Sequence, residues 1–157
     1  EEVRALRQRM PHARIIGIDA NARAITLARK ADPAHAGDYR STATLDPGDR
    51  YDAILALAVF RHGGLEAQRP GSCASILPFA RFASGVAMLD AALVPGGWLA
   101  IANAHFRFAD VPLAAGYAAD PLRIAAPPMT LLYGPDDRRI DGARLDDVLF
   151  RKLPAGD

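Results

Sequence analysis

Apolar residues recur with two different periods along the chain, and each period predicts a different kind of element. Val3, Leu6 and Met10 lie three and four residues apart, which indicates a helix with one apolar stripe that Pro11 ends. Residues 13–19 (ARIIGID) are short, apolar and almost continuous, which is typical of a buried strand. The first elements are therefore predicted to be a helix and a strand.

The same patterns continue through the middle of the chain. Asn21 is a favourable N-cap, so 22–30 (ARAITLARK) is predicted to be a second helix. Residues 51–60 (YDAILALAVF) are apolar on both faces, as a central parallel strand is. Apolar residues every three or four positions predict an amphipathic helix over 76–93, and Pro95–Gly97 (PGG) predicts a tight reversal after it.

Further strands complete the predicted sheet. They are expected at 98–104, at 129–134 and at 147–153, with one more near either 35–39 or 40–45. Residues 61–73 are predicted to be a loop, and 106–128 an irregular insert. This order predicts a single α/β domain over 1–157, with a Rossmann-like, doubly wound and mostly parallel sheet and an antiparallel C-terminal strand.

Composition narrows the classes of function. The 157 residues are 50% hydrophobic and 24% charged, with a formal net charge of +1, which predicts an ordinary soluble domain. Charges that nearly cancel disfavour a nucleic-acid groove, and no apolar run reaches the roughly 18 residues of a membrane span. Cys73 is the single cysteine, and the four histidines are scattered, so no metal site is expected. A cytoplasmic protein is the resulting expectation.

Three stretches, in this order, resemble the class I S-adenosylmethionine-dependent methyltransferases. RIIGIDANARAITLARK (14–30) is similar to the second strand and following helix of that family, and DRYDAILALAVF (49–60) to its fourth strand. LDAALVPGGWLAIANAHF (89–106) is similar to the helix, turn and fifth strand. The closing segment 130–153 would correspond to its antiparallel last two strands.

The resemblance implies S-adenosylmethionine as the cofactor and a set of residues that bind it. Asp19, followed by Ala20, would accept hydrogen bonds from both ribose hydroxyls; alternatively Asp19 merely helps to cap the next helix. Asp38 would meet the adenine amino group, or is a solvated turn residue. Leu57 and Ala58, at the end of the fourth strand, would line the floor of the cofactor cleft.

One part of the family pattern is missing from this sequence. The first strand and its glycine-rich loop should lie about 20 residues before Asp19, a position just before Glu1. We therefore expect an N-terminally truncated domain without its first strand, in which the strands at 13–19 and 51–60 either close against each other or flank a gap. The truncated chain itself is expected to bind little cofactor and to be inactive.

Other polar residues near the predicted strand ends are candidates for work on the acceptor. His62 could act as a general base, or is a loop histidine in water, and the same alternatives hold for Arg61. Asn103 and His105 could reach an acceptor pocket, or face solvent at the end of a strand. Cys73 is expected to be a small core or loop residue.

Two further readings of the function stay open. An acid after the second strand also suits an NAD(P)-dependent oxidoreductase, although the sequence has no Tyr-x-x-x-Lys pair. The chain could also be a non-catalytic fragment or a degenerate relative. Within the methyltransferase reading the acceptor is expected to be a small molecule or a protein, because the strand at 51–60 lacks the Asn/Asp-Pro-Pro-aromatic signature of enzymes that methylate nucleic-acid amino groups. The sequence predicts no particular oligomeric state.

Overall fold

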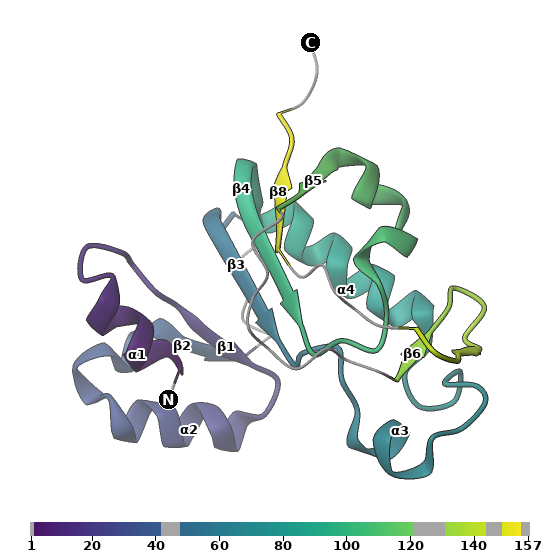
Figure 1. The fold of residues 1–157 in the computed structure, drawn as a ribbon. Helices are drawn as coiled ribbons and strands as arrows, with labels where there is room; N and C mark the ends of the chain where they lie inside the picture. Colours follow the sequence, from purple (N-terminus) through teal and green to yellow (C-terminus); the bar gives the residue numbers. More distant parts are fainter. Residues whose placement is uncertain (1, 42–47, 121–130, 144–148, 155–157) are drawn as a thin grey trace. The chain divides into compact units, whose positions relative to one another are not determined.

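The computed structural model describes residues 2–41, 48–120, 131–143 and 149–154 of the chain. The chain divides into two compact units, Glu1–Asp49 and Arg50–Asp157, each with its own secondary structure (Figure 1).

The first unit is a small parallel α/β arrangement. Its elements are α1 (Glu2–Arg9), β1 (Gly17–Asp19), α2 (Ala22–Ala31), η1 (Pro33–Asp38) and β2 (Tyr39–Ser41). β1 and β2 run parallel, with Gly17 opposite Tyr39 and Asp19 opposite Ser41. Gly17 is required here, because an added Cβ would lie 2.8 Å from Cδ1 of Tyr39. Among the described residues of this unit, the buried apolar side chains are those of Ile25 and Tyr39.

The second unit contains a four-stranded mixed sheet in the order β3-β4-β8-β5. The strands are β3 (Tyr51–Leu57), β4 (Leu93–Ala102), β5 (Tyr117–Ala119) and β8 (Leu149–Lys152). β3 and β4 are parallel, whereas β8 is antiparallel to both β4 and β5. The remaining elements are α3 (Gly63–Gln68), α4 (Phe79–Ala92), η3 (Phe108–Asp110), η4 (Pro112–Gly116), β6 (Leu132–Tyr133) and β7 (Arg139–Ile140).

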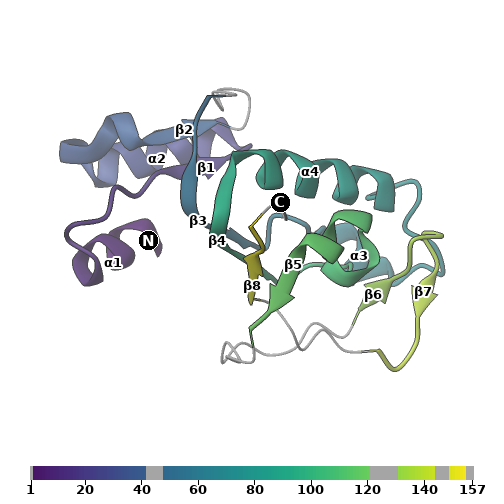
Figure 2. The same cartoon turned by 90° about the horizontal axis from the view of Figure 1, so that it is seen from above.

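The core of the second unit lies between this sheet and α4, which runs along one face of it (Figure 2). Phe82 of α4 is fully buried, stacks on Phe106 and meets the edge of Phe60 at a centroid distance of 4.9 Å. Gly85 lets α4 approach closely, since a Cβ there would lie 2.7 Å from the Phe60 ring. Aromatic packing of this kind contributes stability beyond area burial alone.

Several predicted elements are confirmed. The first helix, the second helix with its Asn21 cap, and the amphipathic helix are present as α1, α2 and α4. The third strand is β2, which spans the junction of the two segments considered, although residues 42–47 lie outside the described part. The segment predicted as a loop after β3 contains a short helix, α3.

The Pro-Gly-Gly segment has a different role from the one predicted. It lies inside β4, where Tyr51 pairs with Leu93 but Ala53 pairs with Trp98, so the extra residues of β4 form a bulge. Gly96 adopts φ +78°, which a residue with a side chain would tolerate poorly. A Cβ on Gly97 would lie 2.9 Å from the carbonyl oxygen of Asp52. These glycines therefore shape the strand rather than reverse the chain.

The prediction of a doubly wound, mostly parallel sheet is wrong. The described strands form three small sheets of two, four and two strands, and most strand pairs in them are antiparallel. β1 and β3 share no ladder, and β3 is an edge strand whose Leu55 and Leu57 are exposed, not a central strand covered on both faces. The closing segments also do not form one hairpin, because β6 pairs with β7 and β8 pairs with β4. Alternating helices and strands predicted the element types well, but strand partners depend on contacts that this alternation does not encode.

Candidate functional site

Asp19 lies at the carboxyl end of β1 in the first unit, and its side chain is exposed. Its Oδ1 accepts a hydrogen bond from the backbone N–H of Asn21 at 2.7 Å. The cap of α2 is Asn21 itself, whose Oδ1 accepts from the N–H groups of Arg23 and Ala24 at 3.0 and 3.3 Å. Asp19 is thus held in place beside the helix without being its cap, and its Oδ2 makes no hydrogen bond within the described residues.

This arrangement gives Asp19 a carboxylate with an accepting oxygen directed to solvent. A carboxylate in this position can accept hydrogen bonds from vicinal hydroxyl groups, and such bonds are strengthened by its charge. Ala20, which follows it, is exposed and offers only backbone groups and a methyl group. The chemistry of this strand end therefore fits a ribose, which carries two neighbouring hydroxyls.

Asp38 is not brought to Asp19. It lies directly before β2, and because β1 and β2 are parallel, it is at the amino edge of the two-stranded sheet while Asp19 is at the carboxyl edge. Its Oδ2 accepts a hydrogen bond from Arg7 at 3.1 Å. Asp38 is thus neither a freely solvated turn residue nor a neighbour of the strand end that carries Asp19.

Arg7 is the centre of a polar network in the first unit. It donates to the backbone oxygen of Ile15 at 2.8 Å and also pairs with Asp32. A hydrogen bond from His35 lowers the pKa of Asp32, and the hydroxyl of Tyr39 donates to the same carboxylate at 2.9 Å. This network holds α1, η1 and β2 together in a unit that has few buried apolar side chains.

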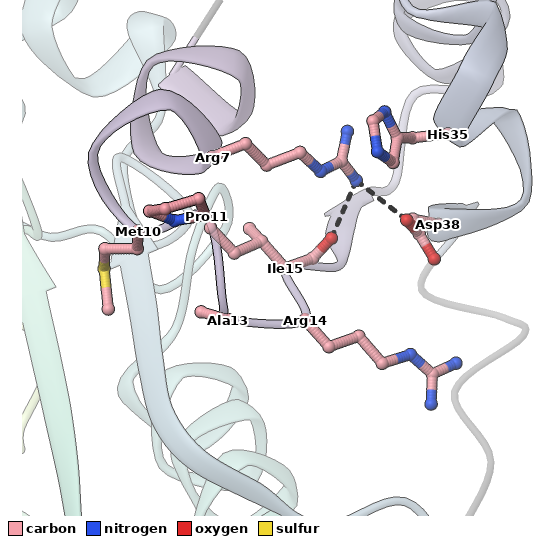
Figure 3. A pocket seen from close by; sticks show the side chains of 8 residues that line it. All are labelled: Arg7, Met10, Pro11, Ala13, Arg14, Ile15, His35 and Asp38. Atoms are coloured by element: carbon pink, nitrogen blue, oxygen red, sulfur yellow. Dashed lines mark hydrogen bonds and ion pairs between the residues drawn. The ribbon is translucent and has the colours of Figure 1, made fainter.

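A cavity of about 400 Å³ opens beside this network (Figure 3). The guanidinium of Arg7 lies beside His35 and is directed toward Asp38 and the backbone oxygen of Ile15, whereas Arg14 points away from them. Ile15 and Asp38 precede β1 and β2, so the cavity is at the amino edge of the parallel pair. Its central charged groups already pair with one another, and we assign it no ligand.

The carboxyl edge of β3 and β4 in the second unit has unusual backbone geometry. Ala58 and Asn103 directly follow the two parallel strands and adopt φ of 56° and 55°. The left-handed conformation is costly for residues other than glycine, and such outliers concentrate at functional sites. Leu57, the last residue of β3, is 45% exposed. Leu57 and Ala58 therefore lie at an exposed strand end, and their contact with a cofactor stays a prediction.

His62 lies four residues beyond Ala58, and its ring is committed to the backbone. Its Nδ1 accepts the N–H of Gly64 at 3.1 Å, which makes His62 the N-cap of α3. In the neutral ring the proton then resides on Nε2, so no basic lone pair faces outward. The neighbouring Arg61 pairs with Glu66 at 2.7 Å. Contacts within and next to α3 therefore explain the positions of both side chains, and neither position requires a substrate.

His105, three residues after β4, has the opposite character. It is fully buried, and its Nδ1 lies 3.0 Å from the carbonyl oxygen of Leu131. A carbonyl oxygen only accepts, so Nδ1 carries the proton and Nε2 holds the lone pair. Nε2 is buried and has no hydrogen-bond partner among the residues that the structure describes. The prediction that allowed His105 to face solvent is therefore wrong.

Cys73 is unsuited to nucleophilic chemistry. It is fully buried, and its thiol donates to Oδ1 of Asp137 at 3.6 Å. Burial, together with the charge of Asp137, raises the pKa of this thiol to about 12. Because the thiolate is the reactive form, Cys73 acts as a core residue, as the sequence predicted.

The sequence pattern gave no reason to prefer His105 over the other histidines. The usable signal was its place three residues after the buried, apolar end of β4. The cap formed by His62 was hidden because histidine is not among the common N-cap residues.

Comparison of the chain with protein-family models, with curated proteins and with solved structures gave no match. In the described ranges, no three His, Cys, Asp or Glu side chains are grouped so that they could hold a metal ion. The described helices include none that is both long and apolar enough to cross a membrane.

Proposed function

We propose that this chain takes part in methyl transfer from S-adenosylmethionine to a small-molecule or protein acceptor, with Asp19 binding the ribose of the cofactor. The observation that carries the proposal is the strand–acid–helix segment of the first unit. There Asn21 supplies the helix cap, and the exposed carboxylate of Asp19 keeps one oxygen for a ligand. The competing explanation, in which Asp19 exists to cap α2, is weakened because a better cap is already in place.

The second unit has a parallel strand pair of its own, with an exposed carboxyl edge. The carboxyl ends of adjacent parallel strands are where open α/β sheets bind ligands. β3 and β4 end together at Leu57 and Ala102, and the chain leaves both through left-handed residues. This edge is therefore a second place in the chain where the backbone is shaped as it often is at functional sites.

Replacing Asp19 tests the proposal. In the native protein that carries this sequence, Asp19→Ala is expected to weaken binding of S-adenosylhomocysteine by about 1.5–3 kcal/mol, because hydrogen bonds to a charged acceptor are lost. Isothermal titration calorimetry measures this change directly. Asn21→Ala is the matched control, since it removes the cap and leaves the carboxylate; its affinity should stay close to the native value. Equal affinity of the native protein and Asp19→Ala would return Asp19 to a local structural role.

A further inference from the structure

His105 joins three segments of the second unit at one junction, formed by Phe60, His105, Leu131 and Tyr133. The backbone N–H of His105 donates to the carbonyl oxygen of Phe60 at 3.0 Å, and its own carbonyl oxygen accepts from the N–H of Tyr133 at 2.9 Å. Its Nδ1 donates to the carbonyl oxygen of Leu131 at 3.0 Å. The segments that follow β3 and β4 are therefore held to β6 by the hydrogen bonds of one histidine.

The imidazole at this junction fits its surroundings in the neutral form. The ring is fully buried, and its Nε2 has no hydrogen-bond partner among the residues that the structure describes. Protonation would place a second N–H donor and a positive charge at Nε2, and burying a charge without a hydrogen-bond partner is costly. The closed junction is therefore compatible with the neutral ring and disfavours the imidazolium.

Two titratable side chains of neighbouring elements face the ring, and neither removes this cost. Glu66 of α3 interacts with the charge that His105 would carry, but its pKa is lowered first by the hydrogen bond from Arg61, with which it forms an ion pair at 2.7 Å. Tyr133 packs edge-on against the ring at a centroid distance of 6.2 Å. Its hydroxyl donates to the carbonyl oxygen of Pro70, and burial raises its pKa, so it is uncharged at neutral pH. The carboxylate is thus already neutralised by a closer cation, and the tyrosine carries no charge.

We propose that this junction is an acid-sensitive latch, which is closed while His105 is neutral and opens when His105 takes up a proton. Histidine side chains ordinarily titrate at about pH 6.5, so opening is expected as the pH falls through that range. The open form binds one proton more than the closed form, and the stability of the closed form therefore decreases as the pH falls. The inference is independent of the proposed function, because neither a cofactor nor an acceptor takes part.

Exchange of the Tyr133 amide hydrogen reports opening directly, because this amide donates to His105 when the junction is closed. The quantity to follow is the protection factor, which compares the measured exchange rate with that of an unstructured peptide at the same pH. In the native protein we expect the protection factor to fall about tenfold for each pH unit between about pH 6 and pH 5, because one proton is taken up on opening.

Two variants show whether His105 is the residue that takes up the proton. His105→Gln has no group at this position that titrates in the histidine range, so its Tyr133 protection factor should be independent of pH between about pH 6 and pH 5. His62→Gln removes the exposed histidine that caps α3 in the same unit, and its profile should follow that of the native protein. Equal losses of protection in the native protein and in His105→Gln, or no loss in the native protein, would overturn the inference.

The native protein gives a second measurement that decides the matter even if His105→Gln does not fold. In protein labelled with ¹⁵N-histidine, two-bond ¹H–¹⁵N spectra should show the ring of His105 in the closed form with its proton on Nδ1 alone. A closed form at about pH 5.5 with protons on both ring nitrogens, and with the Tyr133 amide still protected, would contradict the latch.

Discussion

Individual residues at the strand ends carry the clearest physical signals in this molecule. Ala58 and Asn103 both adopt left-handed conformations, yet the two differ in cost. Asn tolerates this region because its short amide can bond locally, whereas Ala has no such compensation. The helix cap at Asn21 and the acid at the strand end, Asp19, could be predicted from the sequence, because both residues directly follow an apolar run. The left-handed Ala58 could not, because nothing in ALAVF marks a positive φ, whereas Asn103 is of a residue type that adopts this region more often.

Substituting Ala58 with glycine should stabilise the second unit. Relief of the left-handed strain, about 1–2 kcal/mol, exceeds the 0.5–1 kcal/mol of extra chain entropy that glycine loses on folding. The expected gain in the free energy of unfolding is up to about 1.5 kcal/mol, measured by urea titration. Asn103→Gly should gain less. A destabilised Ala58→Gly protein would mean that the methyl group packs more usefully than its backbone conformation costs.

At the scale of elements, three of them meet at one carboxylate in the second unit. Asp90 of α4 accepts from the hydroxyl of Tyr117 of β5 at 2.6 Å and pairs with Lys152 of β8 at 2.9 Å. Burial opposes ionisation of Asp90, but these two partners outweigh it and hold the pKa of Asp90 below its ordinary value. Burial and Asp90 raise the pKa of Tyr117. This contact ties β5 and β8 to the helix that covers the sheet.

Tyr117→Phe should lower the free energy of unfolding by about 1.5 kcal/mol at pH 7, the value of a hydrogen bond to a charged group. Because the pKa of Asp90 is depressed in the folded state, its contribution is present above the ordinary carboxyl pKa and is lost as the pH falls through the folded value. The difference between the two proteins should therefore narrow as the pH falls below the ordinary carboxyl pKa. Urea unfolding followed by the fluorescence of Trp98, the single tryptophan, measures it. A gap that stays constant with pH would contradict this role of Asp90.

The sequence predicted the type of most elements but not how they pair. α4 follows from apolar spacing, and β3 and β4 from their length and composition. The bulge in β4 depends on how Gly97 meets Asp52 of β3, and the antiparallel placement of β8 depends on Phe150 pairing with Leu99. These are contacts between residues far apart in the chain, which local pattern does not specify. For the same reason Asp38 was grouped with Asp19, although the parallel register of β1 and β2 puts them at opposite edges.

At the scale of the whole molecule, the two units differ in what stabilises them. The second unit has a core of many buried apolar and aromatic side chains, whereas the first buries Ile25 and Tyr39 and depends on the ion pairs of Arg7. Exposed or partly exposed ion pairs contribute little compared with apolar burial. Regions with few buried contacts open more readily than the rest of a protein.

Amide hydrogen exchange should show this difference. In the native protein, amides of β1 and β2 are expected to exchange faster than those of β3 and β4, and the gap should close as urea is added and the second unit unfolds. Mass spectrometry of peptic peptides resolves the two groups of strands. Equal protection in both units would mean that they unfold as one cooperative body.

The central claim is our proposal that the protein carrying this chain binds S-adenosylmethionine. Isothermal titration calorimetry tests that proposal most directly. Titration of the native protein with S-adenosylhomocysteine and, separately, with NAD compares the two cofactors whose ribose an acid in this position could hold. The proposal predicts saturable binding of S-adenosylhomocysteine and none of NAD at the same concentrations. Tight binding of NAD without binding of S-adenosylhomocysteine would contradict it and would favour an oxidoreductase.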